Sequence, residues 1–105
     1  MSKLTNEKRA ELKSKHRRAV LWEDKEVGDV VLIPASQFVW DEFIDTASKD
    51  NAAGPTRTLV DQCVVFPPMD ELQAMHRDFP GLADALAKKI RHISGGREDI
   101  QVKEL

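Results

Sequence analysis

The sequence predicts a small α+β domain in which an N-terminal β-hairpin packs on three or four short α-helices. Two runs rich in apolar and β-branched residues, at 19–22 and 30–33, flank a polar loop, as the strands of a hairpin do. Apolar residues then recur at helical spacing through most of the remaining chain. A length of 105 residues suits one domain with one modest core rather than a deep, enclosed cavity.

Proline and serine mark the boundary between the hairpin and the first helix of this domain. Pro34 has no backbone N–H to donate to a strand ladder, so it should end the second strand. Ser36 can accept a hydrogen bond from a backbone N–H at a helix N-terminus. We therefore expect a helix over 37–48. Its i, i+3, i+4 and i+7 positions predict an aromatic face that packs on the core, formed by Trp40, Phe43, Ile44 and Ala47.

A second helix is expected from about Pro55, because a proline loses no hydrogen bond in the first turn of a helix. The run VVF at 64–66 fits either the end of this helix or a short buried strand. The prolines at 67 and 68 end the element in both cases. The buried stripe of the helix would consist of Leu59, Cys63 and Phe66.

Two more helices and a polar tail complete the predicted domain. Asp70 and Glu71 suit a helix N-terminus, Pro80 restarts the chain, and Gly95 offers a left-handed helix end. Alternating apolar residues in 96–105 predict a polar tail or a third strand at the edge of the hairpin. The apolar stripes of the two helices are Met69, Leu72, Met75 and Phe79, followed by Leu82, Leu86, Ile90 and Ile93.

Charge is unevenly distributed along the chain. Residues 1–18 contain seven basic and two acidic residues, a balance of +5, whereas the rest of the chain carries −7. Because this segment has few apolar residues, we expect a flexible or partner-ordered arm ahead of a compact domain at 19–95. It is either a solvated segment or a contact for phosphates or an acidic partner. The basic residues in question are Lys8, Arg9, Lys13, Lys15, Arg17 and Arg18.

Composition also limits the location and the ligands of the protein. A single cysteine cannot form an internal disulfide, residues 1–18 are too polar for a secretory signal, and no apolar run approaches the roughly 18 residues of a membrane span. We therefore expect a cytoplasmic protein that makes no membrane contact. An aromatic content of 6% without tyrosine argues against a base-stacking platform.

Catalysis would have to involve the lone cysteine. Cys63 lies late in an apolar stripe, where burial raises the pKa of a thiol, and it is thirteen residues from His76. A buried core thiol is the commoner role for such a residue. The three histidines stand apart, and the chain has no C-x-x-C or H-E-x-x-H motif. We expect a protein that is not an enzyme and holds no metal or cofactor. An enzyme built on Cys63 ranks third, behind the two binding functions that follow.

Large and flexible apolar side chains are the candidate contacts for a partner. Trp22 and Trp40 are large for so small a domain, and tryptophan is enriched at interface hot spots, although a core position is the commoner outcome. Met69 and Met75 could line a groove with their flexible side chains, or belong to the core.

The stretches VLIPASQFVWDEFID and LVDQCVVFPPMDELQAMHRDFPGLADALAKKI resemble the phage tail assembly chaperones, small proteins encoded among the tail genes of long-tailed phages and prophages. The resemblance spans about 30–94 and includes no enzyme motif. It consists of a strand pair, a helix with Phe43 and Ile44, an element with Leu59, Cys63, Val64 and Pro67, and an aromatic-Pro-Gly turn at Phe79, Pro80 and Gly81 before a terminal helix.

The resemblance implies a chaperone that binds segments of the tape-measure protein, and tail-tube subunits, until the tail polymerises. A helical segment of the partner would lay its apolar face in a groove between helices. The basic segment 1–18 departs from the family pattern. The alternative function is therefore a nucleic-acid-associated regulatory protein that binds through this segment.

Overall fold

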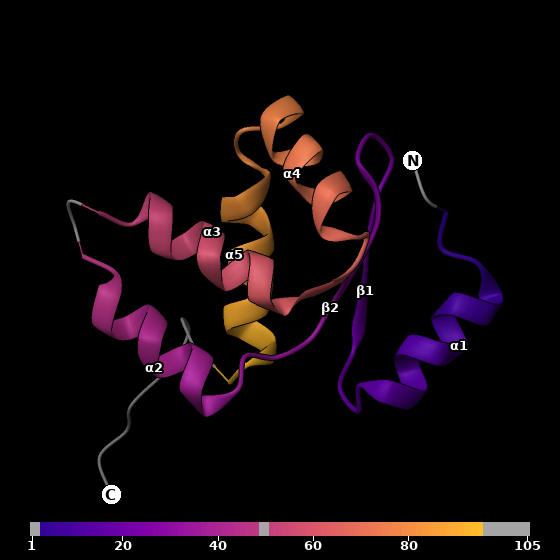
Figure 1. Ribbon diagram of the computed structural model, residues 1–105, viewed down its shortest axis with the longest axis horizontal. Coiled ribbons are helices and arrows are strands. Elements are labelled where there is room, and N and C mark those ends of the chain that lie inside the picture. The colour runs from indigo at the N-terminus through magenta and orange to yellow at the C-terminus, as the bar shows by residue number, and fades with distance from the viewer. Residues whose placement is uncertain (1–2, 49–50, 96–105) are drawn as a thin grey trace, which may run out of the picture.

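The computed structural model describes residues 3–48 and 51–95 (Figure 1). This part of the chain forms five helices and a three-stranded antiparallel sheet, which confirms the predicted α+β class. In chain order the elements are α1 (Asn6–Lys15), β1 (Val20–Asp24), β2 (Gly28–Leu32), α2 (Gln37–Thr46), α3 (Ala53–Cys63), β3 (Val64–Phe66), α4 (Met69–Asp78) and α5 (Leu82–Ile93).

The predicted hairpin is formed by β1 and β2, with β2 at the centre of the sheet. Asp24 closes the turn, because its Oδ1 accepts hydrogen bonds from the backbone N–H groups of Glu26 (2.8 Å) and Val27 (2.9 Å). The bond from Val27, then that from Glu26, lowers the pKa of the Asp24 carboxyl, since both stabilise its ionised form. Gly28 ends the turn at φ +101°, a backbone conformation that other residues rarely adopt.

The third strand is β3, which the sequence left undecided between strand and helix. Helix α3 ends at Cys63, so Phe66 does not belong to a helical stripe with Leu59; it lies on β3, opposite Val31 of β2. Two β-branched residues and the following prolines favour an extended chain here. The predicted edge strand at 96–105 lies outside the described residues.

The main core fills one face of the sheet. Val30 and Leu32 of β2 have no exposed surface and point to this face, as the period of two along a strand requires. Helices α3 and α5 pack against each other and supply most of the remaining side chains, with Met75 from α4. The members from α3 and α5 are Leu59, Val60, Cys63, Leu82, Ala83, Leu86, Ala87 and Ile90.

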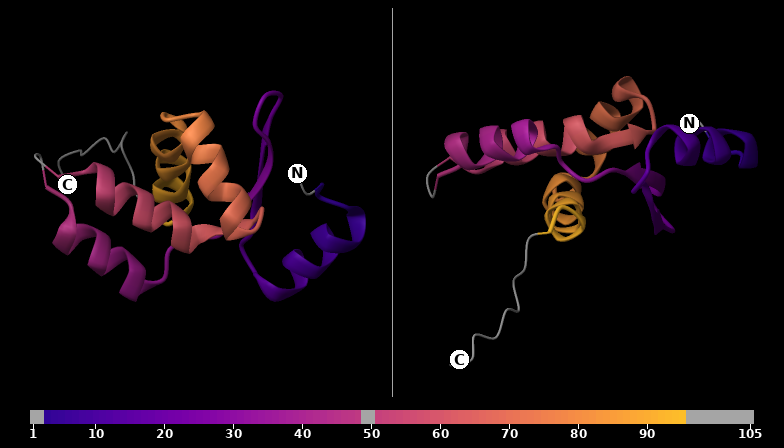
Figure 2. Two further views of the ribbon diagram at one scale, coloured as in Figure 1. Left: turned by 45° about the horizontal axis from the view of Figure 1, so that its top comes forward. Right: turned by 90° about the horizontal axis from the view of Figure 1, so that it is seen from below.

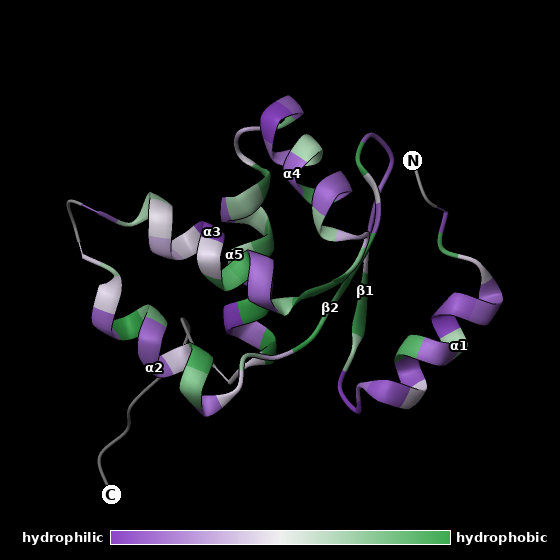
Figure 3. Ribbon diagram, viewed as in Figure 1, coloured by the Kyte–Doolittle hydropathy of each residue, from purple (hydrophilic) through white to green (hydrophobic). Residues whose placement is uncertain are grey.

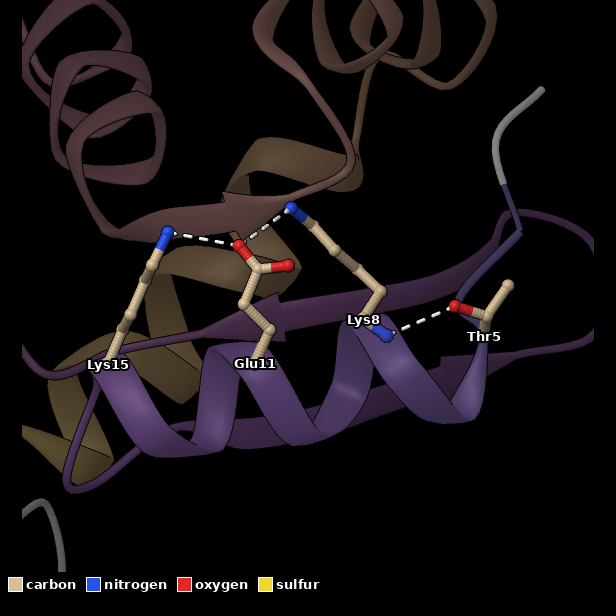
Figure 4. A network of polar contacts seen from close by, with 4 residues as sticks. All are labelled: Thr5, Lys8, Glu11 and Lys15. Carbon is tan, nitrogen blue, oxygen red and sulfur yellow. Dashed lines mark hydrogen bonds and ion pairs between the residues drawn. The ribbon is translucent and has the colours of Figure 1, made fainter.

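Helix α1 touches the opposite face of the sheet through Leu12, whereas a flexible arm was expected. Leu12 is 5% exposed and forms a second buried cluster with Val31 and Phe66. Thr5 caps the helix by accepting a hydrogen bond from the N–H of Lys8 (3.1 Å), as Figure 4 shows. Leu12, with Leu4 and Ala19 packed on the same cluster, thus provides the apolar contact of a helix whose own sequence is almost entirely polar.

Candidate functional site

The apolar face of α2 is only partly covered, which corrects the prediction that it packs on the core. Val39 and Phe43 pack against the main core, but no residue of α2 is buried. Trp40 is half-buried and Ile44 is 56% exposed. Phe38, which lies outside the apolar periodicity of the helix, is 75% exposed. Figure 3 shows apolar turns of α2 along the rim of the molecule.

The position of α2 explains this exposure. The helix runs beside α3 at the edge of the domain (Figure 2), and α3 is the element with which it shares most contacts. Two polar contacts set its start: Ser36 Oγ accepts a hydrogen bond from the N–H of Val39 (3.2 Å), and the N–H of Ala35 donates to Ser94 Oγ (2.9 Å). Since Val39 and Phe43 face inward, the neighbouring row of Trp40 and Ile44 remains on the outer side.

Carboxylates border these exposed apolar side chains. Asp41 and Asp45 are one helical turn apart and so lie on the same side of α2. Asp41 accepts a hydrogen bond from Gln37 Nε2 (2.8 Å). The chain has no Lys or Arg at 26–48, so α2 contains no cation of its own. We call the surface formed by Phe38, Trp40, Asp41, Ile44 and Asp45 the α2 outer face.

A shallow groove of about 130 Å³ lies between α2 and α3, next to the α2 outer face. Phe43 lines this groove, and its ring is 6.0 Å from that of Trp40, centre to centre, with the planes tilted by 49°. The groove therefore continues the aromatic surface of α2 toward α3. Its lining residues are Val39, Glu42, Phe43, Thr46, Pro55, Thr58, Leu59 and Gln62.

The four partner-binding residues expected from the sequence do not form one site. Trp40 belongs to the α2 outer face, whereas Trp22, on β1, packs against the main core. Met75 is 3% exposed and belongs to the core, although it also lines an open depression near the hairpin turn. Met69, at the start of α4, is 51% exposed, so it does not continue the buried stripe of that helix. Met69 is not among the residues that line this depression.

The basic residues of the N-terminal segment fall into two groups. Lys15 (3.0 Å) and Lys8 (3.7 Å) pair with Glu11 Oε1, as Figure 4 shows, and the hydrogen bond from Lys15 is the main cause of the lowered pKa of Glu11. Arg18 donates to the carbonyl oxygen of Ile93 at 2.7 Å. The second group is exposed and shows no ion pair within the described part of the chain; it consists of Arg9, Lys13 and Arg17.

Cys63 and His76 do not form a reactive pair within the described residues. The Cys63 side chain is 1% exposed, and burial raises the pKa of its thiol to about 11, so the thiolate that a nucleophile needs is suppressed. The charged group near His76 is instead Asp61, whose Oδ1 lies 3.4 Å from His76 Nε2 without forming a hydrogen bond.

His76 and Asp61 belong to a polar cluster between α3 and α4. Asp61 Oδ1 accepts a hydrogen bond from Gln73 Nε2 (3.1 Å), and Gln73 Oε1 accepts one from Arg57 (2.8 Å). The sequence gives no sign of this cluster, because helical spacing puts Arg57 and Asp61 on one row of α3 but does not show which helix that row contacts. The cluster joins two helices and leaves His76 almost fully buried.

No family model, curated protein or solved structure matches this chain. Across residues 3–48 and 51–95, no group of three or more His, Cys, Asp or Glu residues is arranged to hold a metal ion. In the same part of the chain, none of the helices combines the length and the hydropathy needed to cross a bilayer.

Proposed function

We propose that the protein acts by binding another protein, as a phage or prophage tail assembly chaperone that holds a tape-measure or tail-tube protein during tail assembly. The observation that carries this proposal is the exposed apolar part of the α2 outer face. Water-exposed apolar surface of this kind is typical of interaction sites, and tryptophan is a common hot spot at their centre.

The residues that carry the family resemblance anchor α3 in the core and mark the turn between α4 and α5. Leu59 and Cys63 anchor α3 in the main core, and Pro80 and Gly81 separate α4 from α5. These residues hold the helical layer beside which α2 lies. Of the two residues that the resemblance places on α2, Phe43 points inward and Ile44 outward, so the pattern includes part of the proposed binding surface.

Nucleic-acid binding through α1 is a second candidate function. Arg9 and Lys13 are one helical turn apart on α1, Arg17 follows shortly after the end of the helix, and all three are exposed. This is a smaller basic surface than the sequence suggested, because Lys8 and Lys15 share Glu11 and Arg18 contacts Ile93. Three phosphate contacts would give a slope of about −2.7 for log K against log salt on duplex DNA.

Co-expression with a tape-measure protein from the same tail gene cluster, followed by pull-down and size-exclusion chromatography, tests the proposal. We expect a soluble complex that persists in the triple variant Arg9→Gln/Lys13→Gln/Arg17→Gln. This variant is preferable to deletion of 1–18, which would remove the buried Leu12. The absence of a complex, together with salt-sensitive DNA binding that the triple variant loses, would refute the chaperone function and favour nucleic-acid binding through α1.

A further inference from the structure

We infer that the α2 outer face binds an amphipathic helix that carries Lys or Arg beside its aliphatic side chains. The inference rests on the proposed function and adds the binding surface and the chemistry of the partner.

The apolar half of the surface suits a helical partner. Trp40 and Ile44 are one turn apart, which is the spacing at which a second helix presents side chains along its own apolar stripe. Ile44 is 56% exposed, and the half-buried Trp40 is braced by the ring of Phe43. A pre-positioned aromatic side chain loses little conformational entropy on binding, which makes Trp40 the expected anchor.

The charged half of the surface determines which side-chain charge the partner must carry. Asp41 is one helical turn before Ile44, Asp45 directly follows it in the chain, and neither aspartate forms an ion pair within the described residues. Docking an apolar helix over Ile44 would remove water from both carboxylates. A neutral or acidic helix would leave them without counter-charges, whereas Lys or Arg side chains on the partner would pair with them.

A second copy of this chain is a poor occupant for two reasons. Two α2 outer faces brought together would place four aspartates against one another, which is repulsive. The basic helix of the chain, α1, has its only leucine, Leu12, already buried against Val31 and Phe66, so it has no apolar stripe to offer. Charge complementarity therefore points to a different protein.

Two designed peptides of about 18 residues test the inference on the full chain. Both carry leucine at i, i+3, i+4 and i+7; one has lysine flanking the stripe and the other has glutamate at the same positions. We expect the lysine peptide to bind at least about tenfold more tightly, by fluorescence anisotropy at low salt, and to weaken as salt is added. Equal affinity for the two peptides would overturn the inference.

Variants locate the binding surface. Ile44→Ser, and the pair Asp41→Asn/Asp45→Asn, should each weaken the lysine peptide by about tenfold. Met69→Ser is the matched control, because Met69 is similarly exposed, at 51%, but lies on α4. Loss of binding in Met69→Ser but not in Ile44→Ser would place the site elsewhere. A dimer of the unmodified chain that Ile44→Ser dissociates would identify a second copy as the occupant and overturn the inference.

The inference and the proposed function fail in different ways. A tape-measure complex that is unaffected by Ile44→Ser and by Asp41→Asn/Asp45→Asn would refute the α2 outer face and leave the chaperone function standing. Binding of the lysine peptide at α2 without any complex with a tail protein would support the α2 outer face as a binding surface and refute the chaperone function.

Discussion

Helices α5 and α2 have similar sequence patterns and opposite environments. Both carry apolar residues at helical spacing, yet Leu86 and Ile90 of α5 are 0% exposed, whereas α2 has no buried residue. Helix α5 packs on α3 within the main core, and α2 lies beside α3 at the edge of the domain. The pattern of a helix shows which face is apolar, but the neighbouring elements decide how much of that face is covered.

The two helices should therefore differ in what stabilises them. Helix α5 begins without a side-chain cap, so burial of its stripe must hold it in place. Helix α2 has the Ser36 cap and one inward-facing row, Val39 and Phe43. Perturbing the core should affect the whole domain, whereas perturbing the outer side of α2 should leave the fold intact and change only binding.

The largest effect is expected at the centre of the core. Leu86→Ala should lower the free energy of unfolding by about 2–5 kcal/mol, because the side chain has no exposed surface and leaves a cavity. Urea denaturation measures the change. A loss below about 1 kcal/mol would mean that the core relaxes around the cavity and that α5 is packed less tightly than the burial of Leu86 indicates.

The next effect concerns the pH dependence of stability through Cys63. The unfolded thiol ionises near its ordinary pKa of 9, but the folded thiol stays protonated to about 11. The stabilising contribution is therefore complete below pH 9 and is lost as the pH rises to about 11, a loss of about 2 to 3 kcal/mol.

Denaturation of the protein and of Cys63→Ala across this pH range isolates the thiol, because the variant lacks that part of the pH dependence. Iodoacetamide near neutral pH should leave Cys63 of the folded chain unmodified. Rapid alkylation would show that the thiol is accessible and would reopen the case for an enzyme.

A smaller effect is expected at the N-cap of α2. Ser36→Ala removes the acceptor for the N–H of Val39 and should cost about 1 kcal/mol. Ser36→Asp keeps a capping side chain and should restore most of that stability. Amide hydrogen exchange gives the readout: faster exchange confined to α2 would agree with a local role for the cap, and faster exchange throughout α5 as well would contradict it.

The smallest effect on stability is expected on the α2 outer face itself. Ile44→Ser should change the free energy of unfolding by no more than about 0.5 kcal/mol, because Ile44 is 56% exposed. Thermal or urea denaturation measures it, with Phe38→Ser as a parallel substitution at a 75% exposed position. A loss of 2 kcal/mol or more would show that the side chain packs on the domain in solution.

Part of the candidate site was predictable, and part was not. The sequence marked Trp40 and Ile44 as members of one apolar row, and the structure keeps them on one row, but it leaves Trp40 only half-buried and Ile44 exposed. Phe38 lies off the row and gave no periodic signal. The absence of Lys and Arg at 26–48 was a signal that could have drawn attention to Asp41 and Asp45.

Local chemistry was readable from the sequence alone. The β-branched runs predicted the hairpin, and Ser36 predicted the start of α2. Pro55 predicted the first turn of α3, and Gly95, which has φ +93°, predicted the end of α5. Each of these depends on the conformational preference or hydrogen-bonding capacity of one residue and its immediate neighbours.

Tertiary packing decided the rest, because it depends on which surfaces meet. Residues 64–66 became a strand because β2 offered an unpaired edge, and α1 docked because Val31 and Phe66 left an apolar patch for Leu12. His76 came to lie beside Asp61 because α4 folds onto α3. Whether the apolar row of α2 is core or surface was likewise settled by the position of α3 and α5, since burial belongs to the assembly of elements rather than to any one of them.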